Sequence, residues 1–116
     1  IKIFILNNQY MGMVRQWQEL LHEKNYSESY SEALPDFVKL ADAYGCKGIK
    51  VENPDDLDNK IKEMVDHNGP VIFDCHVDPS ENCFPMIPSG KPHNQMLLGP
   101  KDQEENKITG KGKALV

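Results

Sequence analysis

Residues 1–8, IKIFILNN, are a short run rich in isoleucine that ends in two asparagines. The run is too brief for a helix and too continuously apolar for a strand with one face in water. Strands of this composition are typical of the interior of a parallel sheet, where both faces are covered. We therefore predict an interior parallel strand over residues 1–6. Because the chain opens inside this run with Ile1 and no preceding turn, we expect a piece of a longer protein, cut at a strand.

Two helices are predicted after this strand. Residues 11–23 carry apolar side chains at helical spacing, with polar residues between them. The polar, serine-rich residues 25–33 separate this helix from a second one, which we expect to begin at Pro35 and to end at Gly45. The apolar positions of the first helix are Met13, Val14, Trp17, Leu20 and Leu21.

The remaining elements complete an alternating pattern. Residues 48–51 predict a short strand, and Asn53 followed by Pro54 is a start signal for a third helix. The run PVIFDCHV, residues 70–77, predicts a last apolar strand. The order strand, helix, helix, strand, helix, strand indicates an α/β fold, with a parallel sheet, flanking helices and right-handed crossovers.

The chain divides into three parts by composition. Residues 1–78 hold all the predicted helices and strands. Residues 79–100 form a closing segment in which proline and glycine are too dense for regular structure over most of its length. Residues 101–116 are polar, and we expect them to be a mobile tail.

Charge and cysteine content exclude several classes of protein. The 116 residues have a formal net charge of −5, and no basic stripe is present to neutralise a nucleic acid backbone. No stretch approaches the roughly 20 apolar residues that span a bilayer, so we expect no membrane partner. The three cysteines form no CxxC pair, which argues against a disulfide framework or a zinc site.

The asparagine pair, Asn7 and Asn8, follows a predicted parallel strand. Ligands of open parallel sheets gather at the carboxyl ends of the strands. A carboxamide there offers an oxygen that suits Mg²⁺, or a donor for a diphosphate. Asparagine pairs also serve simply as turn and cap residues, and the two residues alone do not decide between these roles. No metal-type spacing occurs among the four histidines, His22, His67, His76 and His93.

The context of the pair is the string ILNNQYMGMVRQWQ, residues 5–18. Together with LPDFVKLADAYG (34–45), GPVIFDCHVD (69–78) and FPMIPSGKPHNQM (84–96), this string resembles the large catalytic subunit of acetolactate synthase. The resemblance extends to about Gly99. In that family the asparagine pair closes the thiamin diphosphate motif that begins with GDG, and no GDG occurs in these 116 residues. The resemblance therefore implies the C-terminal part of a thiamin diphosphate-binding fold.

The resemblance assigns roles to six residues. Asn8 would bind Mg²⁺ through its side-chain oxygen, and Tyr10 would bind it through its main-chain carbonyl. The family often has another polar residue where Tyr10 stands, which a main-chain ligand tolerates. Gly12 would keep the turn into the helix narrow. Met13, Val14 and Trp17 would line the entrance to the reactive carbon of the cofactor, with Met13 binding the cofactor and Val14 and Trp17 binding the substrate.

Trp17 has two possible roles. A broad apolar face can favour one more methylene on a substrate by roughly 1–3 kcal/mol, which fits a pocket that separates 2-oxobutyrate from pyruvate. Alternatively, Met13, Val14 and Trp17 form an ordinary core stripe at helical spacing. The resemblance favours the pocket wall.

The implied activity is the thiamin diphosphate-dependent decarboxylation of pyruvate and its carboligation to a second 2-oxoacid, either pyruvate or 2-oxobutyrate. This reaction begins the synthesis of valine, leucine and isoleucine. The resemblance also implies FAD in the full-length family member, in a non-redox role. The glutamate that activates the cofactor belongs to the N-terminal domain of a neighbouring subunit in this family. We therefore expect no catalytic residue in this chain and no activity of the chain alone.

The implied partners are the remainder of the catalytic subunit, further large subunits in a homodimer or tetramer, and small-molecule 2-oxoacids. A small regulatory subunit is left open. The location would be cytoplasmic in a bacterium, or organellar in a eukaryote.

Another thiamin diphosphate carboligase or decarboxylase would share the asparagine pair but should not share GMVRQWQ. A non-catalytic ligand-binding α/β module would use the same strand end, whereas a purely structural domain leaves the asparagines without a role.

Overall fold

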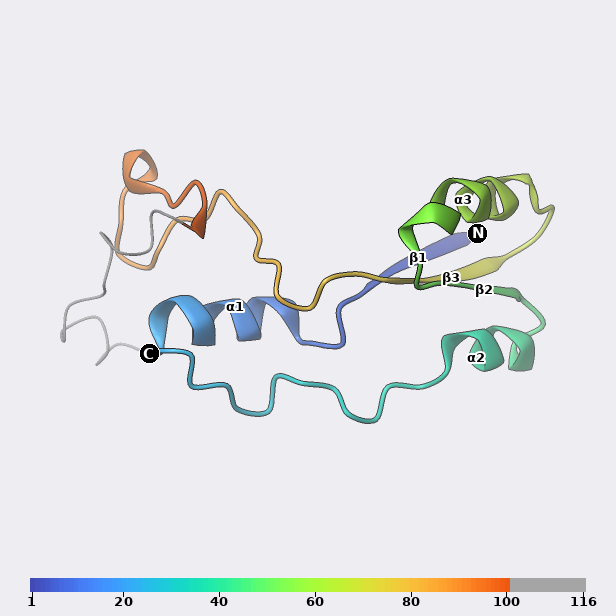
Figure 1. Cartoon of the computed structure of the whole chain (residues 1–116), viewed down its shortest axis with the longest axis horizontal. Coiled ribbons are helices and arrows are strands. Elements are labelled where there is room, and N and C mark those ends of the chain that lie inside the picture. The colour runs from blue at the N-terminus through green and yellow to red at the C-terminus, as the bar shows by residue number, and fades with distance from the viewer. Residues whose placement is uncertain (101–116) are drawn as a thin grey trace. The chain divides into compact units, whose positions relative to one another are not determined.

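The computed structural model describes residues 1–100 (Figure 1). Its contacts group these residues into two compact units. The first comprises residues 1–10 and 31–80, and the second comprises, of the described residues, 11–30 and 81–100. The tail predicted to be mobile, residues 101–116, lies outside the described residues.

The first unit is built on a parallel sheet, as predicted. Its three strands are hydrogen-bonded in the order β1-β3-β2, so that β3 is central. Phe4 and Ile49 both lie in register with Phe73 of the central strand. The carboxyl ends of the strands therefore lie at one edge of the sheet. The strands are β1 (Lys2–Asn7), β2 (Lys47–Val51) and β3 (Val71–His76).

The position of β1 corrects the prediction of an interior strand. Among the described residues β1 pairs only with β3, so it lies at the edge of the sheet. As a result Ile3 and Leu6 are 45% and 69% exposed. The apolar composition of β1 was interpreted as burial on both faces, but burial also requires a second neighbour and a cover. Residues 1–100 supply no second neighbouring strand, and four of the six residues of β1 are exposed.

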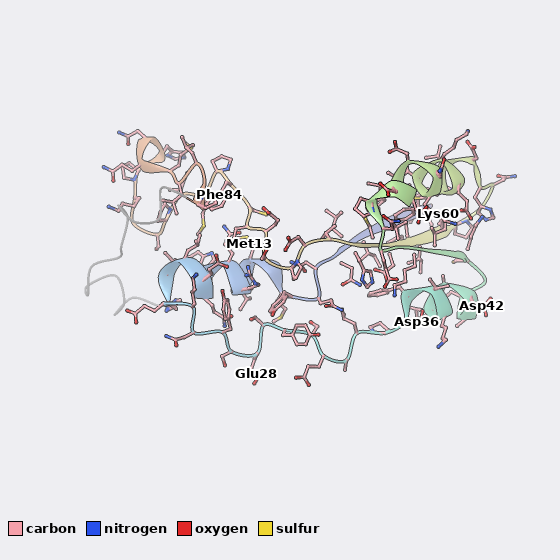
Figure 2. All side chains as sticks on the ribbon, viewed as in Figure 1. Met13, Glu28, Asp36, Asp42, Lys60 and Phe84 are labelled. Carbon is pink, nitrogen blue, oxygen red and sulfur yellow. The ribbon has the colours of Figure 1, made fainter. Side chains whose placement is uncertain are left out.

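Helices cover both faces of this sheet. In Figure 1, α2 (Phe37–Ala43) lies on one face and α3 (Leu57–Asp66) on the other. The predicted second helix starts two residues later than expected. Asp36, labelled in Figure 2, is its cap, and its carboxylate accepts hydrogen bonds from the first-turn amides. The third helix is preceded by a 3₁₀ turn, Pro54–Asp56 (η1).

Start signals and strand alternation account for the core of this unit. The side chain of Asn53 accepts a hydrogen bond from the Asp55 amide at 3.1 Å, which confirms the predicted cap. Because strand side chains alternate between faces, every second residue of β2 and β3 points to α3. The buried core consists of Ile49, Val51, Val71, Phe73 and Cys75, against which Leu57, Ile61 and Met64 of α3 pack.

On the opposite face, Gly48 of β2 allows α2 to approach closely. A Cβ at Gly48 would lie 2.8 Å from the Cα of Val38 and 3.0 Å from its carbonyl oxygen. Both are backbone atoms, so the helix itself would have to move. Gly48→Ala is therefore expected to lower the free energy of unfolding by about 1–3 kcal/mol, the usual cost of overpacking. Urea unfolding measures this cost.

Gly99→Ala is the matched control, since a Cβ there meets no atom within 4 Å. We expect its free energy of unfolding to stay within about 0.5 kcal/mol of the parent, so that its urea midpoint hardly moves. Equal midpoints for the two variants would show that α2 does not pack against Gly48 as described.

The second unit contains α1 (Gly12–Leu21) and the proline-rich segment after residue 80. That segment is not entirely irregular: it includes a 3₁₀ turn, His93–Gln95 (η2). It also includes an antiparallel bridge, in which the amides of Met86 and Leu97 each donate to the other's carbonyl, at 2.9 and 2.7 Å. Within residues 1–100, no helix combines the length and the apolar character needed to cross a membrane.

Candidate functional site

The chain leaves β1 through two successive turns that the asparagine pair closes. The side-chain oxygen of Asn7 accepts a hydrogen bond from the Gln9 amide, and that of Asn8 accepts one from the Tyr10 amide, both at 3.1 Å. Gln9 has a φ of 61°, in the left-handed region that costs a non-glycine residue about 1–2 kcal/mol. The turn role of asparagine pairs is thus confirmed. It leaves a second lone pair on each oxygen for another partner.

Asn7 is tied to the central strand by a buried polar cluster. Its side chain is 8% exposed, and its Nδ2 donates to Oδ1 of Asp74 at 2.8 Å. The other carboxylate oxygen of Asp74 lies 3.3 Å from Nε2 of His76. Asp74 is only 4% exposed, although it is charged. The cluster fixes the carboxyl ends of β1 and β3 to each other.

The cluster continues outward to solvent through charged residues. Nδ1 of His76 lies 3.8 Å from Glu52, which also forms an ion pair with Lys50 at 2.7 Å. The hydrogen bond from Lys50, with its positive charge, holds the pKa of the Glu52 carboxyl below its usual value. Burial raises the pKa of the neighbouring Cys75 thiol, aided by the charge of Asp74. This cysteine therefore stays protonated and is a poor nucleophile.

Asn8 and Tyr10 fit an ion that prefers oxygen. Both are partly buried, and the turn hydrogen bond holds the Asn8 oxygen near the backbone of Tyr10. Mg²⁺ usually takes only one or two protein ligands and completes its shell with water and phosphate oxygens. In residues 1–100 no group of three His, Cys, Asp or Glu side chains is suited to a metal ion. A metal at this turn would therefore need further ligands from a bound phosphate, from water or from outside these residues.

The other predicted site residues lie on the first two turns of α1, in the second unit. Gly12, Met13 and Val14 form its start, and the side chains of Met13 and Val14 are 51% and 43% exposed. Met13 is labelled on α1 in Figure 2. Trp17, one turn further along, is partly buried. Met13 and Val14 are therefore not part of a buried stripe within the described residues. For Trp17, its partial burial is compatible both with a wall of the substrate pocket and with a core position.

Polar residues of α1 are buried instead, which sequence reasoning missed. Gln16 is 2% exposed, and its carboxamide pairs with the backbone of Cys83, donating to the carbonyl at 2.9 Å and accepting from the amide at 2.7 Å. Arg15 forms an ion pair with Glu19 at 2.9 Å, and both contact Asn82. These residues anchor the segment at 82–83 to α1. Only the i, i+4 spacing of Arg15 and Glu19 could have indicated part of this arrangement.

Comparison with known proteins places these residues in a wider family. Residues 1–75 match the model described as "Thiamine pyrophosphate enzyme, C-terminal TPP binding domain". The acetolactate synthase large subunit of Cyanidium caldarium is 50% identical over 84% of this chain and 17% of its own length. That of Haemophilus influenzae is 41% identical over 91% of this chain and 19% of its own length. The mitochondrial acetolactate synthase catalytic subunit of Saccharomyces cerevisiae is 46% identical over 78% of this chain and 13% of its own length. The chain thus spans less than a fifth of the length of these relatives.

Proposed function

Through residues 1–75, which match the C-terminal TPP-binding domain, this chain belongs to the thiamine pyrophosphate enzyme family. We therefore propose that it acts within a complete acetolactate synthase large subunit. That subunit would decarboxylate pyruvate and join the two-carbon unit to pyruvate or 2-oxobutyrate, for branched-chain amino acid synthesis. The observation that carries the proposal is the identity of 41–50% to large subunits over 84–91% of the chain.

The turn after β1 would hold the Mg²⁺ ion that accompanies the cofactor diphosphate. Asn8 would contribute its side-chain oxygen and Tyr10 its main-chain carbonyl, while Gly12 and Met13 would lie against the cofactor. The hydrogen bond from the Tyr10 amide to the Asn8 side-chain oxygen supports this assignment, because it holds that oxygen beside the backbone of Tyr10. When bound, thiamin diphosphate supplies the electron sink for decarboxylation. No residue of this chain is assigned to FAD, which we propose for the complete subunit only.

The start of α1 would receive the second 2-oxoacid. The exposure of Met13 and Val14 supports a binding role, since both residues are exposed and can contact a ligand. Val14 and Trp17 would supply the apolar wall that recognises the substrate's alkyl group. Buried Gln16 supports this arrangement as well, because its pairing with Cys83 fixes the rotation of α1 relative to the 82–83 segment.

The remainder of the subunit would cover the exposed edge of the sheet. Ile3 and Leu6 of β1 are 45% and 69% exposed, and Ile1 just before the strand is 86% exposed, although β1 has the apolar composition of an interior strand. We propose that residues 1–78 are the C-terminal part of the cofactor domain, followed by a closing segment at 79–100 and a tail. Large subunits would pair as a dimer or tetramer.

A comparison of two preparations tests this function. The complete subunit, cloned with its upstream sequence, is expected to form acetolactate from pyruvate when thiamin diphosphate, Mg²⁺ and FAD are present. Residues 1–116 alone are expected to give no product above background, since they contain no GDG motif. The colorimetric acetoin assay measures both. Turnover by the short chain, or none by the complete subunit, would contradict the proposal.

The upstream sequence separates the alternatives. A GDG motif and a pyrimidine-binding domain upstream would support the enzyme, whereas a start codon just before Ile1 would support a small ligand-binding module. A different thiamin diphosphate carboligase would reveal itself by product formation from other 2-oxoacids.

A further inference from the structure

The buried carboxylate of Asp74 has no part in the metal site proposed above, yet it lies at the same end of the sheet. Burial of a charge is costly unless hydrogen bonds replace its hydration. Both carboxylate oxygens of Asp74 have such partners, in Asn7 and His76. The contact to Asn7 leads directly to the turn that carries the proposed metal ligands.

The carboxamide of Asn7 is fixed at both ends. Its Nδ2 donates to Asp74 at 2.8 Å, and its Oδ1 accepts from the Gln9 amide at 3.1 Å. A flipped amide would lose both bonds, because nitrogen would face the Gln9 amide and oxygen would face the carboxylate. The charge of Asp74 therefore selects the orientation of Asn7. That orientation in turn holds Gln9 in its unfavourable left-handed conformation, with φ at 61°.

We propose that Asp74 is a positioning residue for the Mg²⁺ site. Acting through Asn7, it sets the turn that presents the Asn8 oxygen and the Tyr10 carbonyl to the ion. Groups that orient metal ligands from outside the coordination shell commonly affect metal affinity by about 10- to 100-fold. The inference rests on the proposed function, because it takes Asn8 and Tyr10 as the ligands.

A reversal of the hydrogen bond tests this role in the complete subunit. Asn7→Asp sets two carboxylates against each other and is expected to raise the Mg²⁺ concentration for half-maximal thiamin diphosphate binding by about tenfold or more. Adding Asp74→Asn rebuilds the bond in the opposite direction, with the new amide at 74 donating to the new carboxylate at 7. The double variant should return to within about threefold of the parent. Calorimetric titration of Mg²⁺ in the presence of thiamin diphosphate gives these values.

Two controls separate positioning from charge and from folding. Glu52→Gln removes a charge at the same end of the sheet from a residue that forms no hydrogen bond with Asn7. It should leave the Mg²⁺ concentration for half-maximal binding unchanged. An added carboxylate at position 7 would by charge alone attract Mg²⁺, so weaker binding by Asn7→Asp cannot result from charge. The melting temperature is recorded for each variant. If Asn7 and Asp74 only stabilised the fold, the substitutions would lower the melting temperature and the number of binding sites, but the Mg²⁺ concentration for half-maximal binding would not change.

The outcomes distinguish this inference from the proposed function. If the parent subunit binds thiamin diphosphate with Mg²⁺ but the double variant stays as weak as Asn7→Asp, Asp74 does not act through Asn7. The same conclusion follows if Asn7→Asp needs the same Mg²⁺ concentration for half-maximal binding as the parent, whether or not fewer binding sites remain. A parent subunit with no Mg²⁺-dependent binding overturns the proposed function, and this inference with it.

Discussion

Asn8→Ala in the complete subunit is expected to weaken Mg²⁺-dependent binding of thiamin diphosphate by about 100-fold or more, while the protein remains folded. Removing groups that only orient metal ligands already weakens binding by about 10- to 100-fold, so loss of a ligand should reach at least the upper end of this range. The effect on folding should be smaller. Asn8 makes a single turn hydrogen bond to the Tyr10 amide, and such a bond contributes about 0.5–1.5 kcal/mol.

The measurement is a titration of thiamin diphosphate at fixed Mg²⁺, alongside the melting temperature. Asn68→Ala is the matched control, because this exposed asparagine lies before β3, at the opposite end of the parallel strands. Asn8→Asp retains an oxygen ligand and should lose less affinity than Asn8→Ala. Unchanged affinity in Asn8→Ala would leave Asn8 as a turn residue only.

Trp17→Leu is expected to change the choice between 2-oxobutyrate and pyruvate as the acceptor. If the indole forms the wall that receives the second 2-oxoacid, its loss should remove at most roughly 1–3 kcal/mol of discrimination, about 10- to 200-fold. Both acceptors are supplied together, and the product ratio is measured with the melting temperature. The melting temperature should change little, because Trp17 is only partly buried among the described residues.

Leu21→Ala provides the contrasting case on the same helix. Leu21 is 8% exposed, so its truncation should cost about 2–5 kcal/mol of stability and leave the product ratio unchanged. If Trp17→Leu behaves in the same way, with a large drop in melting temperature and a constant ratio, Trp17 belongs to the core and not to the substrate pocket.

Local signals in the sequence were sufficient for the elements of the fold. Apolar runs predicted β1 and β3, helical spacing predicted α1, and the Asn53–Pro54 pair predicted the start of the third helical segment. Each of these signals acts between residues close in the chain, through side-chain periodicity or through capping of free backbone amides. The family likewise followed from a contiguous string, residues 5–18, because its signature needs no tertiary contact to be recognised.

Only the tertiary structure decided which polar residues are buried and which apolar ones are exposed. Asn7 meets Asp74, Arg15 meets Asn82 and Gln16 meets Cys83, and each of these pairs is 67 residues apart. Asp74 was predicted only as part of an apolar strand, and Gln16 only as one of the polar residues between the apolar positions of a helix. A residue's polarity does not reveal a distant hydrogen-bond partner. Burying a polar group is favourable only when that partner is present. The edge position of β1 has the same origin, since its exposure depends on which neighbours the fold supplies and not on its own composition.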